Sequence, residues 1–204
     1  MCPWLNHDDD LKADVTHSEA KKLKATGVDV ISVGVGKHAD FKELKDIASN
    51  DHLVFRPKSF GELEKIRKEL TTKACQTAQA PTTINRPLTV SLSVPRTFYL
   101  GVSCNMSTNT ISLSPGAFYL GVDDAQFSAI LFGSQVSQLF SFGQYTELDK
   151  ISAALHGAQY SQGGSCGMAG AFQYAWQTSF TTASGARPDV PRVVILLTDS
   201  QAEN

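Results

Sequence analysis

The sequence predicts an α/β protein whose mostly parallel sheet is flanked by helices, in a Rossmann-like architecture. The run Val193–Leu197 has five apolar residues without alternation, as expected for a strand buried on both faces. A carboxylate, Asp199, follows directly, where parallel sheets place their ligand chemistry. Residues 19–70 read as helix, strand, helix, strand and helix, which implies parallel strands joined by right-handed crossovers.

A capping residue, a helix-ending glycine and a run of apolar residues predict the first helix and the first strand. Thr16 or Ser18 is expected to cap a helix that ends near Gly27, because hydroxyls favour the first position and glycine favours the end. Residues 28–35 are rich in valine and isoleucine, which is typical of a strand.

Capping residues also delimit the elements up to residue 70. Asp40 is expected to cap a short helix over residues 41–47, and His52–Arg56 is predicted to be a short strand. Ser59–Glu62 has the form of a capping box before a helix over residues 63–70.

Charged residues are concentrated in the first part of the chain. Residues 1–76 hold 13 of the 18 basic and 13 of the 20 acidic residues, and residues 74–87 have linker composition. We therefore predict one part over residues 1–75, a linker over 76–87, and a second part over 88–204. Within the second part, Leu88–Val94 alternates like a strand. Residues 95–128 are hard to interpret, but Phe98–Val102 recurs as Phe118–Val122, which a β-arch or a small duplication would explain.

The remaining elements lie between residues 128 and 204. Ala129–Phe132 and Leu139–Phe142 are predicted to form a hairpin, and a helix is expected from Thr146 to Leu155. The glycine-rich loop Gly163–Gly167 then leads into a helix over residues 169–181, before the strand Val193–Leu197.

Composition excludes several classes of function. A net charge of -2 over 204 residues gives no reason to expect a nucleic-acid partner, and no apolar run is long enough for a transmembrane segment. The first ten residues lack the pattern of a signal peptide. The four cysteines have no CxxC spacing for zinc, and their even number permits disulfides without assigning any.

A dinucleotide site is the first alternative function. Gly34, Gly36 and Ala39 fit the G-x-G-x-x-A fingerprint between a strand and a helix. However, Arg56 stands where an acidic residue should bind a ribose, and could at best suit the 2′-phosphate of NADP. Because the carboxylate of Asp40 would repel a phosphate, a plain strand-to-helix turn is the better interpretation.

Two other motifs are weaker. Gly163–Gly167 matches the G-x-S-x-G nucleophile elbow, but the required strand does not precede it and all five histidines lie upstream. A loop that passes close to another backbone is the better interpretation. Asp8–Asp10 lacks the spacing of a calcium loop and is expected to be an exposed acidic start.

Several long stretches together resemble the von Willebrand factor type A domain, of the kind found in collagen VI chains and matrilins. The resemblance covers residues 10–75 and 128–204 and implies a non-enzymatic module that binds protein ligands. The stretches that carry it are Ala20–Gly36, Asp51–Phe55, Ser59–Leu70, Tyr160–Gly167, Gly185–Pro188 and Val193–Asp199.

The resemblance also implies a metal-ion-dependent adhesion site, which binds Mg²⁺ through an Asp-x-Ser-x-Ser motif, a threonine and a later aspartate. Asp199 matches that aspartate, and the threonine position falls on Cys166 or, with a shift of one residue, on Ser165. Ser91 and Ser93 have the serine spacing, but Thr89 replaces the aspartate. A thiol is a poor Mg²⁺ ligand, so the site is expected to be degenerate and to bind Mg²⁺ weakly.

The order of the matching segments is unusual. Residues 1–75 resemble the C-terminal half of the family domain, and residues 88–204 its N-terminal and middle parts. Two origins fit: a tandem array sampled out of frame, or a circular permutant whose two pieces complete one another. The second predicts that Val30–Val35 lies beside Val193–Leu197.

We therefore predict an adhesion or assembly module of the extracellular matrix. Its expected partners are matrix or cell-surface proteins, through collagen-like contacts or self-association. The family is mostly secreted, and the missing signal peptide means that either the true N-terminus lies upstream or the protein stays inside the cell. The alternatives are an NADP-binding Rossmann-type protein and a truncated product without independent activity.

Overall fold

The computed structural model describes residues 9–77, 96–103, 120, 125–133, 135–158, 167–187 and 190–199. Within these residues, six strands form a single sheet in the order β2-β1-β6-β3-β4-β5. The β4–β5 pair is an antiparallel hairpin, as predicted, and every other neighbouring pair is parallel. The strands are β1 (Val28–Gly34), β2 (Val54–Phe55), β3 (Arg96–Ser103), β4 (Ala125–Phe132), β5 (Val136–Phe140) and β6 (Arg192–Thr198).

Strand β6 lies in the middle of the sheet, between β1 and β3. Seven residues of β1 pair with it in parallel register, from Val28 opposite Arg192 to Gly34 opposite Thr198. The expected neighbourhood of Val30–Val35 and Val193–Leu197 is therefore confirmed. An early and a late stretch of the chain complete one sheet.

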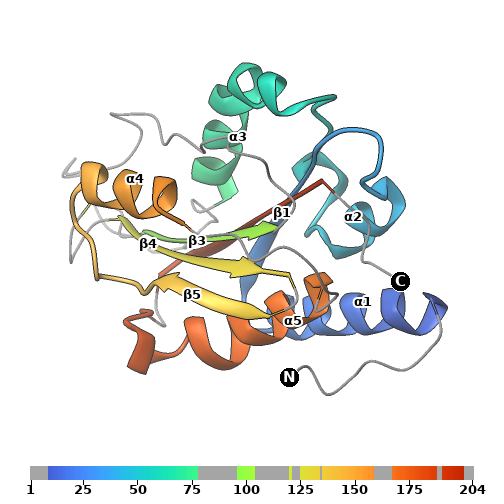
Figure 1. Ribbon diagram of the computed structural model, residues 1–204. Helices are drawn as coiled ribbons and strands as arrows, with labels where there is room; N and C mark the ends of the chain where they lie inside the picture. The colour runs from blue at the N-terminus through green and yellow to red at the C-terminus, as the bar shows by residue number, and fades with distance from the viewer. Residues whose placement is uncertain are drawn as a thin grey trace, which may run out of the picture.

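Helices cover both faces of this sheet (Figure 1). Helices α3 and α4 lie over one face, and α1, α2 and α5 lie over the other. This three-layer arrangement confirms the predicted fold class. The helices are α1 (Asp9–Ala25), α2 (Phe41–Ile47), α3 (Leu63–Thr77), α4 (Leu148–His156) and α5 (Gly167–Tyr174), which continues as a π-helical turn over Ala175–Ser179.

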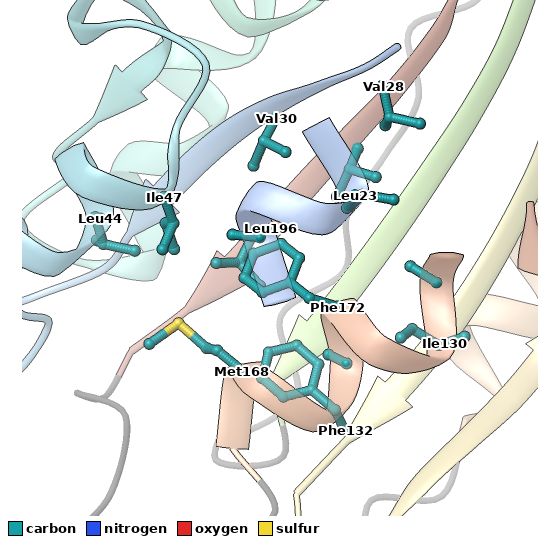
Figure 2. Packing of buried hydrophobic residues seen from close by; sticks show 14 of the residues in the cluster. Leu23, Val28, Val30, Leu44, Ile47, Ile130, Phe132, Met168, Phe172 and Leu196 are labelled. Atoms are coloured by element: carbon teal, nitrogen blue, oxygen red, sulfur yellow. The ribbon is translucent and has the colours of Figure 1, made fainter. Parts of the chain in front are cut away.

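The two faces bury separate hydrophobic clusters, and β6 contributes to both. Val193 and Leu197 belong to the cluster under α3 and α4. Val194 and Leu196 belong to the cluster under α1, α2 and α5, which Figure 2 shows from close by. This double burial explains the unbroken apolar run, because helices cover both faces of the strand.

Three local predictions require correction. Helix α1 begins at Asp9, so Thr16 and Ser18 lie inside it and cap nothing; Thr16 is buried on the side of the sheet. Residues 51–53 form a short 3₁₀ turn, so the strand predicted from His52 begins at Val54. The expected capping box does not form: the side chain of Ser59 caps nothing, and Glu62 accepts from the amide of Lys58 at 2.7 Å.

The predicted linker begins inside a helix. Helix α3 continues through Thr77, and Ala74 is buried in the cluster with β4 and α4. Residues 78–87 and the predicted strand Leu88–Val94 lie outside the described residues. The assignment of residues 1–75 and 88–204 to separate parts stays a prediction.

A buried carboxylate connects α1 with the end of α5. Glu19 is 8% exposed, accepts from Trp176 Nε1 at 2.8 Å and pairs with Lys22 at 2.5 Å. Nearby, the guanidinium of Arg192 donates to the carbonyl of Thr26, just beyond the C-terminus of α1. Cations are favourable at that end of a helix, so β6 and α1 are joined by charge as well as by packing.

Replacing Glu19 with alanine is expected to lower the free energy of unfolding by about 1.5–3 kcal/mol, because the Trp176 donor loses a charged acceptor. Lys22→Ala is the matched control: its side chain is 53% exposed, so we expect a loss under about 1 kcal/mol. Urea unfolding of both variants measures the difference. Equal losses would show that the salt bridge, and not the indole contact, carries the effect.

Candidate functional site

The candidate site lies at the edge of the sheet where the parallel strands end. Strands β1 and β6 finish together, with Gly34 opposite Thr198. The amide of Val35 then donates to the carbonyl of Thr198 at 2.8 Å, and the amide of Gly36 donates to that of Pro57 at 2.9 Å. These bonds hold the loop after β1 against the ends of its two neighbouring strands.

Asp199 lies at this edge, as predicted. It follows the last residue of β6 and is half-buried, whereas Thr198 is 1% exposed. The central position of β6 places this carboxylate between the ends of β1 and β3. Ligands bind at such places in open α/β sheets, because loops diverge there and leave backbone groups accessible.

The second predicted ligand is outside the described residues. Ser165 and Cys166 belong to the stretch 159–166, so their distance from Asp199 stays untested. Helix α5 begins directly after them, at Gly167, and buries Met168 in the cluster that also contains Leu196. The first turn of α5 is thus anchored under β6.

The position of β3 bears on where an Asp-x-Ser-x-Ser motif would lie. The strand beside β6 is β3, which ends at Ser103. Thr89, Ser91 and Ser93 precede β3 in the chain, whereas the family motif follows its strand. Residues 104–108, which do follow β3, have no carboxylate in the sequence.

A magnesium site is therefore not assembled by the described part of the chain. No group of three or more His, Cys, Asp and Glu side chains within it could hold a metal ion. Of the expected ligands, the described residues supply Asp199, and one carboxylate does not make a Mg²⁺ site.

Packing and helix capping explain the residues that suggested a dinucleotide site. A side chain at Gly34 would meet Leu44 Cδ1 at 2.4 Å and Ala39 Cβ at 2.9 Å, so this glycine lets α2 pack closely. Asp40 caps α2 by accepting from the amides of residues 42 and 43 at 2.8 and 3.3 Å. The helix end that would bind a phosphate thus already carries a carboxylate, and Arg56 stacks over the ring of Phe41 at 4.2 Å.

Charged side chains near α2 hold that helix in place. Lys24 donates to the carbonyls of Asp46 and Ala48, at 3.3 and 3.1 Å, near the end of α2. Burial lowers the pKa of Lys24, and the charge of Asp46 opposes this shift. On the exposed side, a hydrogen bond from Lys45 lowers the pKa of Asp51. These interactions are structural.

The remaining motifs gain no support as sites. Helix α4 ends at His156, and the serine of the G-x-S-x-G match lies outside the described residues. Asp9 and Asp10 are the first two residues of α1. No described helix is long and apolar enough to cross a membrane.

Comparisons with known proteins agree with this architecture. The model of the von Willebrand factor type A domain matches residues 7–69 and 107–204. Mouse matrilin-1 is 25% identical over 235 aligned residues, which cover 94% of this chain and 46% of matrilin-1. The human collagen alpha-5(VI) chain is 25% identical over 198 residues, covering 96% of this chain and 7% of that protein. The chain thus spans about half the length of matrilin-1.

One similar solved structure is proximal thread matrix protein 1 from the mussel byssus, described with a zinc-occupied MIDAS motif. It is 26% identical, covers 90% of this chain and 46% of its own, and superposes with a TM-score of 0.42. The two stretches matched by the family model contain all the helices and strands described above except β3 and the C-terminal half of α3, which lie between them. The chain therefore belongs to the von Willebrand factor type A domain family.

Proposed function

We propose that this chain is an adhesion or assembly module of the extracellular matrix, which acts through protein–protein contacts and catalyses no reaction. The observation that carries the proposal is the family match over two stretches whose strands lie in one sheet, with β3 between them. Relatives that align with nearly the whole chain are matrilin-1 and collagen VI chains. By the same relationship we propose that the protein is secreted.

Matrix binding is tested directly with immobilised collagen VI and with the immobilised chain itself. We expect saturable binding of the soluble chain to at least one of these two surfaces, and none to immobilised serum albumin. Absence of binding to both would contradict the proposed function. Cooperative unfolding of the same preparation distinguishes a folded module from a truncated product without activity.

We further propose that these contacts form without a tightly bound metal. The position of the family threonine falls on Cys166 or Ser165, and residues 104–108, directly after β3, carry no carboxylate. Magnesium prefers hard oxygen ligands in an octahedral arrangement, so a thiol in that set weakens the site. Asp199 and Ser165 remain the residues that would hold Mg²⁺.

Metal and cofactor binding is measured by thermal shift with Mg²⁺, Mn²⁺ and NADP⁺. We expect the melting temperature to change by less than about 1 °C at millimolar concentrations, because a ligand stabilises only when its concentration exceeds its Kd. A shift with Mn²⁺ or Mg²⁺ that Asp199→Ala abolishes would restore the adhesion site. Stabilisation by NADP⁺ alone would favour the dinucleotide alternative instead.

A further inference from the structure

The described part of the chain divides into two segments, which lie on either side of residues 78–95 in the sequence. The first segment (residues 9–77) contains α1, β1, α2, β2 and α3, and the second segment (residues 96–199) contains β3 to β6, α4 and α5. Residues 78–95 are the one covalent connection between them in the sequence. The contacts between the segments that the described residues show are noncovalent.

The noncovalent interface runs through the centre of the molecule. It includes the ladder between β1 and β6, with seven residue pairs in register. Hydrogen bonds from Trp176 to Glu19 and from Arg192 to Thr26 add specific polar contacts. On the other face, Ala74 of α3 is buried in one cluster with Phe127.

Neither segment is complete without the other. Without the first segment, β6 would expose a row of backbone amides and carbonyls along one side. Val194 and Leu196, which are at most 2% exposed in the folded chain, would also lose the part of their cover that comes from α1, α2 and β1. An open apolar strand edge pairs with any available strand. The second segment therefore requires a first segment.

We propose that this requirement is also met by a second copy of the chain. The first segment of one copy packs on the second segment of another and forms the same β1–β6 ladder between chains. Such an exchange repeats every contact of the closed chain, so it needs no new surface. The proposal deepens the assembly function proposed above, because a chain whose two segments engage different neighbours extends into a polymer.

Local concentration decides between the closed and the exchanged form. A short connection holds the two segments of one chain at an effective concentration of about millimolar, so closure dominates in dilute solution. Exchange becomes competitive when copies are crowded to similar concentrations, as on a matrix surface. Refolding from denaturant should therefore give monomers at micromolar and dimers or larger species at millimolar concentration, measured by light scattering after gel filtration.

Complementation of two damaged full-length chains tests the proposal most sharply. One variant carries Leu23→Asp and Val30→Asp in the first segment, and the other carries Val194→Asp and Leu196→Asp in the second. All four side chains are at most 2% exposed, so each variant alone is expected to lose its cooperative unfolding transition. Refolded together, they should form a heterodimer with one intact module, and recover about half the unfolding signal.

A matched mixture supplies the control. A third variant carries Leu44→Asp and Ile47→Asp, which also damage the first segment. When this third variant is refolded with the first, neither chain has an intact first segment. We therefore expect the mixture to recover no cooperative unfolding signal. Failure of the complementary mixture, together with monomers at all concentrations, would overturn the proposal. Because the readout is folding, this failure is distinguishable from a failure of matrix binding.

Discussion

Replacement of Phe172 with alanine is expected to lower the free energy of unfolding by about 3–5 kcal/mol. The ring is 1% exposed and is one of the largest fully buried side chains among the described residues. Figure 2 shows it within the cluster, with Leu23 of α1, Phe132 of β4 and Leu196 of β6. Because these neighbours come from three different elements, they cannot all move inward to fill the cavity.

Urea unfolding followed by far-ultraviolet circular dichroism measures this loss. Val15→Ala is the matched control, because Val15 is 43% exposed on α1 and its truncation should change stability by less than about 0.5 kcal/mol. A loss under about 1 kcal/mol for Phe172→Ala would mean that α5 does not cover this face of the sheet.

Replacement of Gly185 with alanine is expected to cost about 2–4 kcal/mol, for two separate reasons. The residue has φ +81°, in the left-handed region that disfavours a side chain. A Cβ atom there would also lie 2.4 Å from the carbonyl oxygen of Phe142, which is backbone and cannot rotate away. The turn before β6 must therefore shift away from the end of the β4–β5 hairpin.

Two other glycines separate these causes. Gly167 has φ +44° with no atom within 4 Å of its added Cβ, so Gly167→Ala reports backbone strain alone, about 1 kcal/mol. At Gly61, which has neither problem, alanine should change stability by less than about 0.5 kcal/mol. Thermal melts of the three variants measure the order of their losses in stability. Equal effects at Gly185 and Gly167 would show that the contact with Phe142 is relieved without cost.

Much of the fold followed from local sequence patterns. The unbroken apolar run in β6, the valine-rich run in β1 and the carboxylate cap at Asp40 each have a short-range cause, and all three were predicted within a residue or two. Local rules failed at Thr16, where a hydroxyl at a good capping position lies inside a longer helix. Packing of α1 against α5 and β1 overrides that weak preference.

The candidate site was less accessible to sequence reasoning. Asp199 was found because it directly follows a strand that is easy to recognise. The neighbouring strand β3 was not predicted, because residues 88–94, which precede it, have the more regular alternating pattern. The contact between Glu19 and Trp176 spans 157 residues, and neither side chain carries a local signal of its partner.

The sequence by itself determined the family, the class of fold and the central place of the strand that carries Asp199. Those properties depend on hydrophobic periodicity and on short stretches that a local pattern can identify. The tertiary structure decided that β1, from the start of the chain, lies beside β6, from its end. It also decided that both faces of β6 are buried under helices from both segments. Strand pairing depends on the burial of surfaces far apart in the chain, which no local pattern specifies.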